Sequence, residues 1–372
     1  MTPLAEKLAP ENIKKLIPYQ SARRIGGSGR LWLNANELEQ PLFFTEHQPA
    51  LHRYPDFLPH DIAAAYQAYC KTTQPTIAVR GADEAIDLLV RTFCQPMQDS
   101  IAICTPTYAM YEFCAESFSV NVIDCPLLAP DFSLDVENVI KAADNANLLF
   151  LCSPNNPTGQ LLNRSDIVAI LESTQDKSLV VVDEAYIEFE LAESVVDLIE
   201  QYPNLIVIRT LSKAFGLAAV RCGFIIASSS VMAFISKLVP PYPMPDSSAE
   251  IVLKALSPKG LTHVRDNTQA LIRIRDNFIQ QIQDLSWIET IYPSSTNFVL
   301  IRTQPGIELF DYLVKQGVVT RNQSHEPSLK HCVRITIGSE TSMQEVSKII
   351  CNFSGALTPS NKNRDITHEQ NA

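Results

Sequence analysis

Lys213 lies in apolar surroundings, and that setting gives its amine a definite chemistry. It belongs to the segment T-L-S-K-A-F-G-L-A-A-V-R-C-G, which runs from Thr210 to Gly223 and whose other charged residue is Arg221. An amine among small and apolar neighbours is costly to hold as an ammonium ion, so the neutral form, a nucleophile toward an aldehyde, is favoured. One lysine at a loop-to-helix junction is more often a surface residue, and the polar groups upstream decide between these two interpretations.

Two polar residues follow a run of apolar residues in V-V-D-E-A-Y, namely Asp183 and Tyr186. A carboxylate can pair with a protonated ring nitrogen, and a phenol can donate to a neighbouring oxyanion. Asn156, in S-P-N-N-P-T-G, is a second candidate partner for that oxyanion. These groups meet the needs of a pyridinium ring with a 3-hydroxyl, although Asp183 alone could cap the next helix and Asn156 alone could belong to a turn.

A third set of residues could hold a phosphate. Gly81–Asp83 precede a predicted helix, where unpaired backbone N–H groups and the helix dipole favour an anion. Thr210 and Ser212 offer hydroxyls and Arg221 offers a cation, and a hydrogen bond to a charged group contributes roughly 1.5–3 kcal/mol. Arg221 alone could equally be a surface salt-bridge partner; its spacing from Lys213 favours the phosphate.

The elements that must position these residues alternate between helix and strand. Glu84–Cys94 has helical spacing of its apolar residues and Ile101–Cys104 is typical of a buried strand. Short runs that are apolar on both faces belong in the middle of a mostly parallel sheet covered by helices, and we predict three of them at residues 147–152, 179–182 and 205–208. The predicted fold class is therefore α/β and doubly wound, and the polar clusters that follow these strands should meet at one site.

The pattern of predicted helices and strands changes after about residue 246. We predict an N-terminal arm over residues 1–30, a large cofactor-binding domain over 31–245, connecting helices over 246–285 that are interrupted near Pro258 and Gly260, and a small α+β domain over 286–355. The tail, residues 356–372, is polar and lacks an apolar face, so we expect it to be disordered.

Composition excludes several other classes of protein. A net charge of -11 over 372 residues, without a long basic tract, argues against a nucleic-acid partner. The 9 cysteines are scattered and form no C-x-x-C pair, and the 7 histidines show no metal-ligand spacing, so we expect free thiols and no metal site. No apolar run is long enough to cross a bilayer and the N-terminus has no secretory pattern, which predicts a cytoplasmic enzyme.

Taken as an ordered set, the motifs S-P-N-N-P-T-G, D-E-A-Y and S-K-A-F-G with a following arginine resemble the fold type I pyridoxal-phosphate-dependent aminotransferases. The resemblance runs from Pro18 to Ile350. Within these aminotransferases, further motifs resemble the histidinol-phosphate aminotransferase family more specifically. The motifs that carry the narrower resemblance are P-Y-Q-S-A-R-R, L-N-A-N-E, R-Y-P-D, R-G-A-D-E-A-I-D-L-L, P-T-Y-A-M-Y, R-T-L-S-K-A-F-G-L-A and V-R-I-T-I-G.

The resemblance implies a seven-stranded mostly parallel sheet sandwiched by helices, a smaller α+β domain and a homodimer with a shared active site. It also implies a role for each matched residue. Lys213 would bind the cofactor covalently and shuttle a proton, Asp183 would hold the ring nitrogen, and Tyr186 with Asn156 would hold the 3-oxygen. The remaining implied contacts are Tyr108 stacked on the ring and, around the phosphate, Ala82, Asp83, Thr210, Ser212, Arg221 and Tyr54 of the partner subunit.

For the substrate, the resemblance implies that Arg334 grips an anionic group, assisted by Arg321, Tyr19 and Asn156. The implied reaction converts histidinol phosphate and 2-oxoglutarate to imidazole-acetol phosphate and glutamate. Two positions depart from the family pattern: Leu38–Glu39 replaces an Asn-Pro pair, and Met97 occupies a turn position usually held by glycine.

Other functions remain open on the sequence alone. A protein of the same fold could transaminate aromatic amino acids or decarboxylate a phosphorylated amino acid. A non-catalytic sensor built on the fold is a different class of protein, and it would need a DNA-binding module for which this acidic chain has no long basic segment.

Overall fold

The computed structural model describes residues 2–18, 36–37, 52–56 and 58–353, and it divides into two compact units. The first unit comprises Met1–Ile272 and Pro293–Asn297, and the second comprises Arg273–Tyr292 and Phe298–Ala372. Residues 2–18 of the predicted arm are described, whereas the rest of the arm, the pair Leu38–Glu39 and the predicted tail lie outside the described residues.

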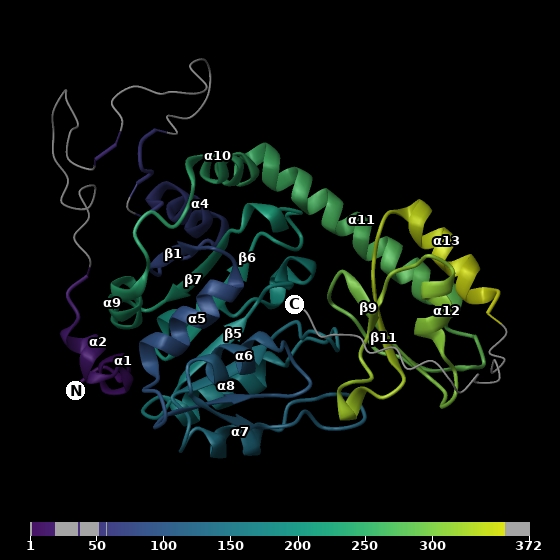
Figure 1. The fold of residues 1–372 in the computed structure, drawn as a ribbon, viewed down its shortest axis with the longest axis horizontal. Coiled ribbons are helices and arrows are strands. Elements are labelled where there is room, and N and C mark those ends of the chain that lie inside the picture. Colours follow the sequence, from purple (N-terminus) through teal and green to yellow (C-terminus); the bar gives the residue numbers. More distant parts are fainter. Residues whose placement is uncertain (1, 19–35, 38–51, 57, 354–372) are drawn as a thin grey trace. The chain divides into compact units, whose positions relative to one another are not determined.

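A seven-stranded sheet forms the centre of the first unit, with strand order β1-β7-β6-β5-β4-β2-β3 (Figure 1). β3, β2, β4, β5 and β6 are mutually parallel, whereas β7 runs antiparallel to both of its neighbours. The predicted α/β architecture with a mostly parallel seven-stranded sheet is therefore confirmed. The strands are β1 Thr76–Val79, β2 Ser100–Ile103, β3 Asn121–Asp124, β4 Leu148–Cys152, β5 Leu179–Asp183, β6 Leu205–Thr210 and β7 Gly223–Ala227.

Helices cover both faces of this sheet because the central strands are apolar on both sides. Along β4, Leu148 and Phe150 pack into one core cluster while Leu149 and Leu151 pack into the other, as the period-2 alternation of a strand requires. Buried residues of α1, α5, α6 and α9 line the first cluster, and those of α4, α7, α8 and α10 line the second. The helices are α1 Leu4–Leu8, α2 Glu11–Lys15, α4 His60–Cys70, α5 Ala82–Phe93, α6 Met110–Ser117, α7 Val136–Ala142, α8 Arg164–Thr174, α9 Ser229–Leu238 and α10 Asp246–Ala255.

The long helix α11, Pro258–Ile282, continues from the first unit into the second. The predicted interruption near Pro258 and Gly260 is present, since α10 ends at Ala255 and α11 begins at Pro258, with Gly260 in its first turn. A Cβ at Gly260 would come within 2.2 Å of the Ala255 carbonyl oxygen, so glycine allows the tight approach between the two helices.

The second unit contains a four-stranded antiparallel sheet of order β10-β11-β9-β8. Its strands are β8 Ile288–Ile291, β9 Phe298–Thr303, β10 Arg321–Asn322 and β11 Cys332–Thr336, and its own helices are α12 Leu309–Lys315 and α13 Glu340–Cys351.

Met97, in the first unit, has φ 61, so its turn position has the left-handed backbone that favours glycine, as the family pattern indicated.

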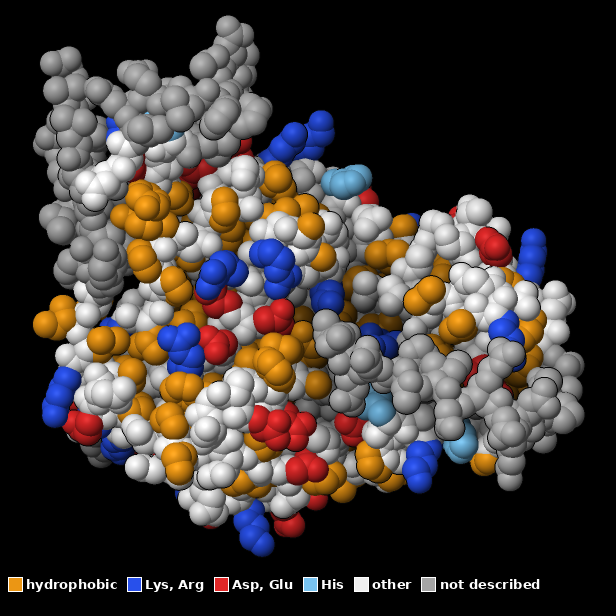
Figure 2. All heavy atoms as spheres, in the orientation of Figure 1, with side chains coloured by type: hydrophobic (Ala, Val, Ile, Leu, Met, Phe, Trp, Pro, Cys, Tyr) orange, Lys and Arg blue, Asp and Glu red, His pale blue; other side chains and the backbone are white. Residues whose placement is uncertain are grey.

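Each of the 9 cysteines lies in the described part of the chain and is free. Among the described residues, no helix combines the length and the hydropathy that a membrane span requires. On the described residues of the face drawn in Figure 2, lysine and arginine side chains lie scattered among acidic ones.

Candidate active site

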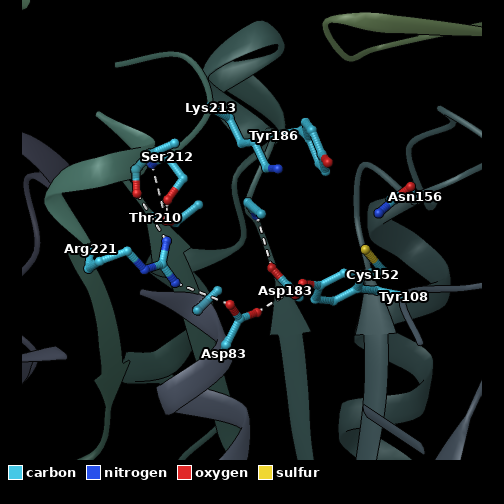
Figure 3. A pocket seen from close by; sticks show the side chains of 13 residues that line it. Asp83, Tyr108, Cys152, Asn156, Asp183, Tyr186, Thr210, Ser212, Lys213 and Arg221 are labelled. Atoms are coloured by element: carbon cyan, nitrogen blue, oxygen red, sulfur yellow. Dashed lines mark hydrogen bonds and ion pairs between the residues drawn. The ribbon is translucent and has the colours of Figure 1, made fainter. Parts of the chain in front are cut away.

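The carboxyl ends of the central strands bring the polar clusters of the sequence together at one pocket, which lies in the first unit (Figure 3). β4 and β5 are in register with Cys152 opposite Asp183, and β6 lies on the other side of β5. The residues that line the pocket are Ala82, Asp83, Tyr108, Cys152, Asn156, Asp183, Ala185, Tyr186, Thr210, Ser212, Lys213, Ala218 and Arg221. Most of the predicted site residues are therefore neighbours in the fold.

Asp183 is held at the floor of the pocket by a hydrogen bond to each of its carboxylate oxygens. The Tyr111 hydroxyl donates to Oδ2 at 2.7 Å and the Ala185 backbone N–H donates to Oδ1 at 3.0 Å. The residue is 2% exposed, and burial raises the pKa of its carboxyl from 3.8 to about 6, against the lowering effect of Tyr111. A carboxylate in this setting gains from a cationic partner in the pocket.

Asp83 ties two other lining residues together. Its Oδ1 accepts a hydrogen bond of 2.9 Å from the Tyr108 hydroxyl, and its Oδ2 lies 3.2 Å from Nη2 of Arg221. The Arg221 guanidinium also donates to the carbonyl of Ala218 at 3.1 Å. The salt bridge that was an alternative for Arg221 is thus present, and it points the guanidinium along the pocket wall beside Ser212 (Figure 3).

The end of the pocket near Arg221 has the groups of an anion site. α5 begins at Ala82, and its N-cap Gly81 has φ 90 and no side chain, so first-turn N–H groups are available to an anion at the positive end of the helix. Thr210 Oγ1 lies 3.0 Å from Ser212 Oγ, which gathers two hydroxyls at the same end. A phosphate accepts hydrogen bonds from all of these groups.

Lys213 and Tyr186 lie together at the mouth of the pocket. The Lys213 Nζ is 5.3 Å from the centroid of the Tyr186 ring, and the Asn156 side chain reaches toward the pocket from the loop after β4 (Figure 3). Lys213 is exposed in the single chain, so the desolvation argued from its apolar sequence neighbours is not present there. Those neighbours pack away from the amine: Ala214 and Phe215 are buried whereas Lys213 is not.

Three residues of the site were missed from the sequence. Tyr111 and Cys152 contact or line the pocket, and Asn155 donates from Nδ2 to the Pro106 carbonyl at 2.9 Å while its Oδ1 accepts from Thr107 at 3.0 Å. Asn155 thereby fixes the loop that carries Asn156 to the loop that carries Tyr108. Tyr111 lies three residues after Tyr108, on the next turn of the chain, and this spacing is the signal that could have identified it. Burial raises the pKa of the Cys152 thiol to about 12, so Cys152 lines the pocket as an unreactive thiol.

Three of the described residues predicted for the site are not among those that line this pocket. Tyr54 is 50% exposed and stacks on Tyr242, with ring centroids 4.6 Å apart. Arg321 and Arg334 belong to the second unit, where they are register partners across β10 and β11. Tyr19 lies outside the described residues.

A buried ionic cluster lies behind the pocket residues, on the opposite face of the sheet from Asp183. Arg209 is 1% exposed and its Nε donates to Glu184 Oε2 at 2.6 Å, while its Nη2 donates to Ser194 Oγ at 2.8 Å. Glu188 lies 3.6 Å from Arg209 Nη1, and burial raises the pKa of Glu188 to about 7. Since Glu184 follows Asp183 and Arg209 precedes Thr210, the cluster fixes the ends of β5 and β6 next to the pocket.

The sequence matches the model of one protein family over most of its length. Residues 31–350 match the family of aminotransferases of class I and II, and the chain belongs to that family.

Within that family, the chain is similar to enzymes of one specificity. It is 41% identical to the histidinol-phosphate aminotransferase of Salmonella arizonae and 42% identical to that of Escherichia coli O45:K1, in each case over 91% of this chain and 94% or 95% of the relative.

Solved structures of the same fold extend the comparison. The histidinol-phosphate aminotransferase of Clostridium acetobutylicum has a TM-score of 0.74 and 25% identity, and the match covers 81% of this chain and 90% of that one. The enzyme of that name from Sinorhizobium meliloti, solved in complex with pyridoxal-5'-phosphate, has a TM-score of 0.73 at 22% identity and covers 81% and 82%, so it shows the shared fold.

Proposed function

We propose that this protein is a pyridoxal-phosphate-dependent histidinol-phosphate aminotransferase. It converts L-histidinol phosphate and 2-oxoglutarate to imidazole-acetol phosphate and L-glutamate, a step of histidine biosynthesis. One observation carries the proposal: a lysine amine, a buried carboxylate and a cation with two hydroxyls line one pocket in a chain 41% identical to an enzyme of that name. The opposite ends of this pocket suit the two ends of the cofactor.

The residues present fit pyridoxal phosphate. The Asp183 carboxylate suits the ring nitrogen, and Tyr186 with Asn156 suits the 3-oxygen. The backbone of Ala82 and Asp83 at the start of α5, with Thr210, Ser212 and Arg221, suits the phosphate, and Tyr108 suits the ring face. The buried carboxylate of Asp183 at one end and the helix start without a side-chain cap at the other are the observations that support this fit.

When bound, pyridoxal phosphate supplies an aldehyde that condenses with amines and a ring that accepts electrons. Lys213 Nζ would bind the aldehyde covalently and, as a neutral amine, would remove the α-proton of the substrate. Asp183, as a carboxylate, would hold a proton on the ring nitrogen, so that negative charge developing in the transition state would meet a cation. Tyr186 would donate to the oxygen at ring position 3 and so hold the orientation of the ring.

The second unit supplies a candidate site for the anionic groups of the substrates. Arg321 and Arg334 face each other across an antiparallel pair, so their side chains leave the sheet on the same face. Like charges in this position destabilise a sheet by up to about 1 kcal/mol, a cost that a shared phosphate or carboxylate removes. Guanidinium groups bind both anions in a bidentate manner, which suits an enzyme that alternates between histidinol phosphate and glutamate.

The proposal includes a cytoplasmic homodimer in which Tyr54 of one protomer completes the phosphate site of its partner. Half of the Tyr54 residue surface is exposed in the single chain, and its ring is held by stacking on Tyr242. Both observations support a tyrosine that is presented to another subunit. Free cysteines support a reducing compartment.

Turnover by the purified protein tests the specificity. Histidinol phosphate with 2-oxoglutarate is expected to yield glutamate, whereas the matched variant Lys213→Ala is expected to yield none. Rapid turnover of phenylalanine with none of histidinol phosphate would establish an aromatic aminotransferase instead, and release of carbon dioxide from a phosphorylated amino acid would establish a decarboxylase. Arg334→Gln is expected to raise KM for histidinol phosphate about ten-fold or more, because a charged hydrogen-bonding pair is lost.

A further inference from the structure

Tyr111 is a buried tyrosine of α6 whose hydroxyl reaches the carboxylate at the floor of the pocket. It is 0% exposed, and the hydroxyl donates to Asp183 Oδ2 at 2.7 Å across a sequence separation of 72 residues. The 2.7 Å distance is typical of a well-formed O–H···O hydrogen bond. The hydrogen bond therefore connects α6 directly to the group that faces the cofactor.

The ring of Tyr111 is fixed on two sides. It stacks on Phe150 of β4, with centroids 4.9 Å apart and an interplanar angle of 18°. It also meets Tyr108 edge-on, with centroids 5.8 Å apart and an angle of 87°. A ring held in this way leaves its hydroxyl little freedom, so the donor is already in place before any cofactor binds.

The direction of this hydrogen bond favours one protonation state of Asp183. Burial raises the pKa of the Tyr111 phenol well above its ordinary value, so the hydroxyl keeps its proton and donates it. A donor to a carboxylate stabilises the ionised form, and Tyr111 is the strongest of the groups that lower the pKa of Asp183 against the effect of burial. With the Ala185 N–H on Oδ1, both oxygens are held and each retains a lone pair for the pocket.

We infer that Tyr111 is a positioning residue that, through its hydrogen bond to Asp183, holds this carboxylate ionised and in place for the ring nitrogen of the cofactor. The inference rests on the proposed function for the identity of the cofactor. Tyr111 touches Asp183 rather than the reacting atoms, so it acts by supporting the proton on the ring nitrogen.

The proton on the ring nitrogen can be observed directly, because the ¹⁵N chemical shift of a pyridine changes on protonation. The experiment binds ¹⁵N-labelled pyridoxal phosphate to the full chain and follows this signal with pH in wild type, Tyr111→Phe, Asp183→Asn and the double variant. Tyr66→Phe is the matched control, because Tyr66 is an equally buried tyrosine whose ring stacks on Phe224, in the core cluster on the other face of the sheet. Tyr111→His, which keeps a ring donor, is the second variant.

The expected result is that the ring nitrogen of Tyr111→Phe loses its proton at a lower pH than that of wild type or Tyr66→Phe. Tyr111→His recovers part of this difference in pH. In the Asp183→Asn background, Tyr111→Phe causes no further change in the pH at which the ring nitrogen loses its proton. The kcat of Tyr111→Phe falls by roughly ten-fold with little change in KM, as expected for loss of one charged hydrogen bond used in the transition state.

An unchanged ¹⁵N titration in Tyr111→Phe would overturn the inference. It would also be overturned if Tyr111→Phe lowered kcat as much in the Asp183→Asn background as in wild type, because that would indicate a merely structural role. The ¹⁵N signal needs no substrate. A protein that failed to turn over histidinol phosphate would therefore contradict the proposed function while leaving the role of Tyr111 to be decided by the titration.

Discussion

The guanidinium of Arg221 lies 3.2 Å from the carboxylate of Asp83, which accepts a hydrogen bond from Tyr108 at its other oxygen. One acidic residue in the first turn of α5 therefore orients both the cation at the anion end of the pocket and the aromatic ring beside it. The arrangement links the proposed phosphate contact to the proposed ring contact before the cofactor binds.

Arg221→Gln is predicted to weaken binding of pyridoxal phosphate by about ten- to a hundred-fold, since a hydrogen bond to a charged group contributes roughly 1.5–3 kcal/mol. Binding of pyridoxal, which has no phosphate, should change much less. Fluorescence or absorbance titration of the cofactor-free protein measures both. Arg91→Gln, on α5 and paired with Asp87 at 3.1 Å, is the control and should bind both compounds as wild type does. An equal loss for the two compounds in Arg221→Gln would contradict a phosphate contact.

Gly81→Ala is predicted to disturb the same end of the pocket through sterics. Gly81 has φ 90, and a Cβ there would come within 2.7 Å of Arg221 Nη2, so the guanidinium would have to move. Gly317→Ala is a matched control, because Gly317 has φ 79 with open space around the added carbon. Both variants should lose about 1–2 kcal/mol of stability from the left-handed backbone, but only Gly81→Ala should also weaken cofactor binding. Equal cofactor affinities in the two variants would rule out the steric link.

Asp183 gives the cofactor-free protein a characteristic dependence of stability on pH. Because burial raises the pKa from 3.8 to about 6, the folded state holds this proton more tightly than the unfolded state. The resulting stabilisation is fully present below pH 3.8 and is lost as the pH rises through 6, a change of ~3 kcal/mol. The residue that replaces Asp183 in Asp183→Asn does not titrate. The free energy of unfolding of this variant should therefore rise relative to that of wild type between pH 4 and 6. Urea denaturation at a series of pH values measures this, and a difference that stayed constant over the range would count against the assignment.

Arg209→Met is predicted to destabilise the cofactor-free protein by about 3–5 kcal/mol, because it leaves the buried carboxylates of Glu184 and Glu188 without their cation. Chemical denaturation measures the change. Arg265→Met removes an exposed pair, in which the Arg265 side chain is 64% exposed, and should cost less than about 0.5 kcal/mol. A loss below 1 kcal/mol in Arg209→Met would mean that the cluster contributes little to the folded state.

Much of the fold could be predicted because the central strands are apolar on both faces. The predicted runs at residues 147–152, 179–182 and 205–208 became β4, β5 and β6 with shifts of one or two residues at their ends. Strand order could not be derived in the same way, because pairing is non-local: β7 inserts antiparallel between β1 and β6, and nothing in G-F-I-I-A states its neighbours. Gly223 marks the close approach there, since a Cβ would come within 2.6 Å of the Gly81 backbone.

The residues of the candidate site that lie at the ends of strands could be predicted from the sequence. Asp183 follows an apolar run directly and Thr210 follows another after Arg209, so the rule that ligands bind at the carboxyl ends of strands identifies them. Tyr111 was not predicted because its partner Asp183 is 72 residues away and reaches it only through the packing of α6 on the sheet. The exposure of Lys213 was likewise unpredictable, since sequence neighbours do not determine which side of a turn faces solvent.

We propose that Lys213 anchors the cofactor in this pocket. The most direct measurement is to load the protein with pyridoxal phosphate, reduce it with borohydride and locate the modified residue by peptide mass spectrometry. The prediction is a visible absorption band that the reduction abolishes, with the phosphopyridoxyl group on Lys213 and no such band in Lys213→Ala. A reduced adduct located on another lysine, or a colourless wild-type protein after incubation with the cofactor, would contradict the account.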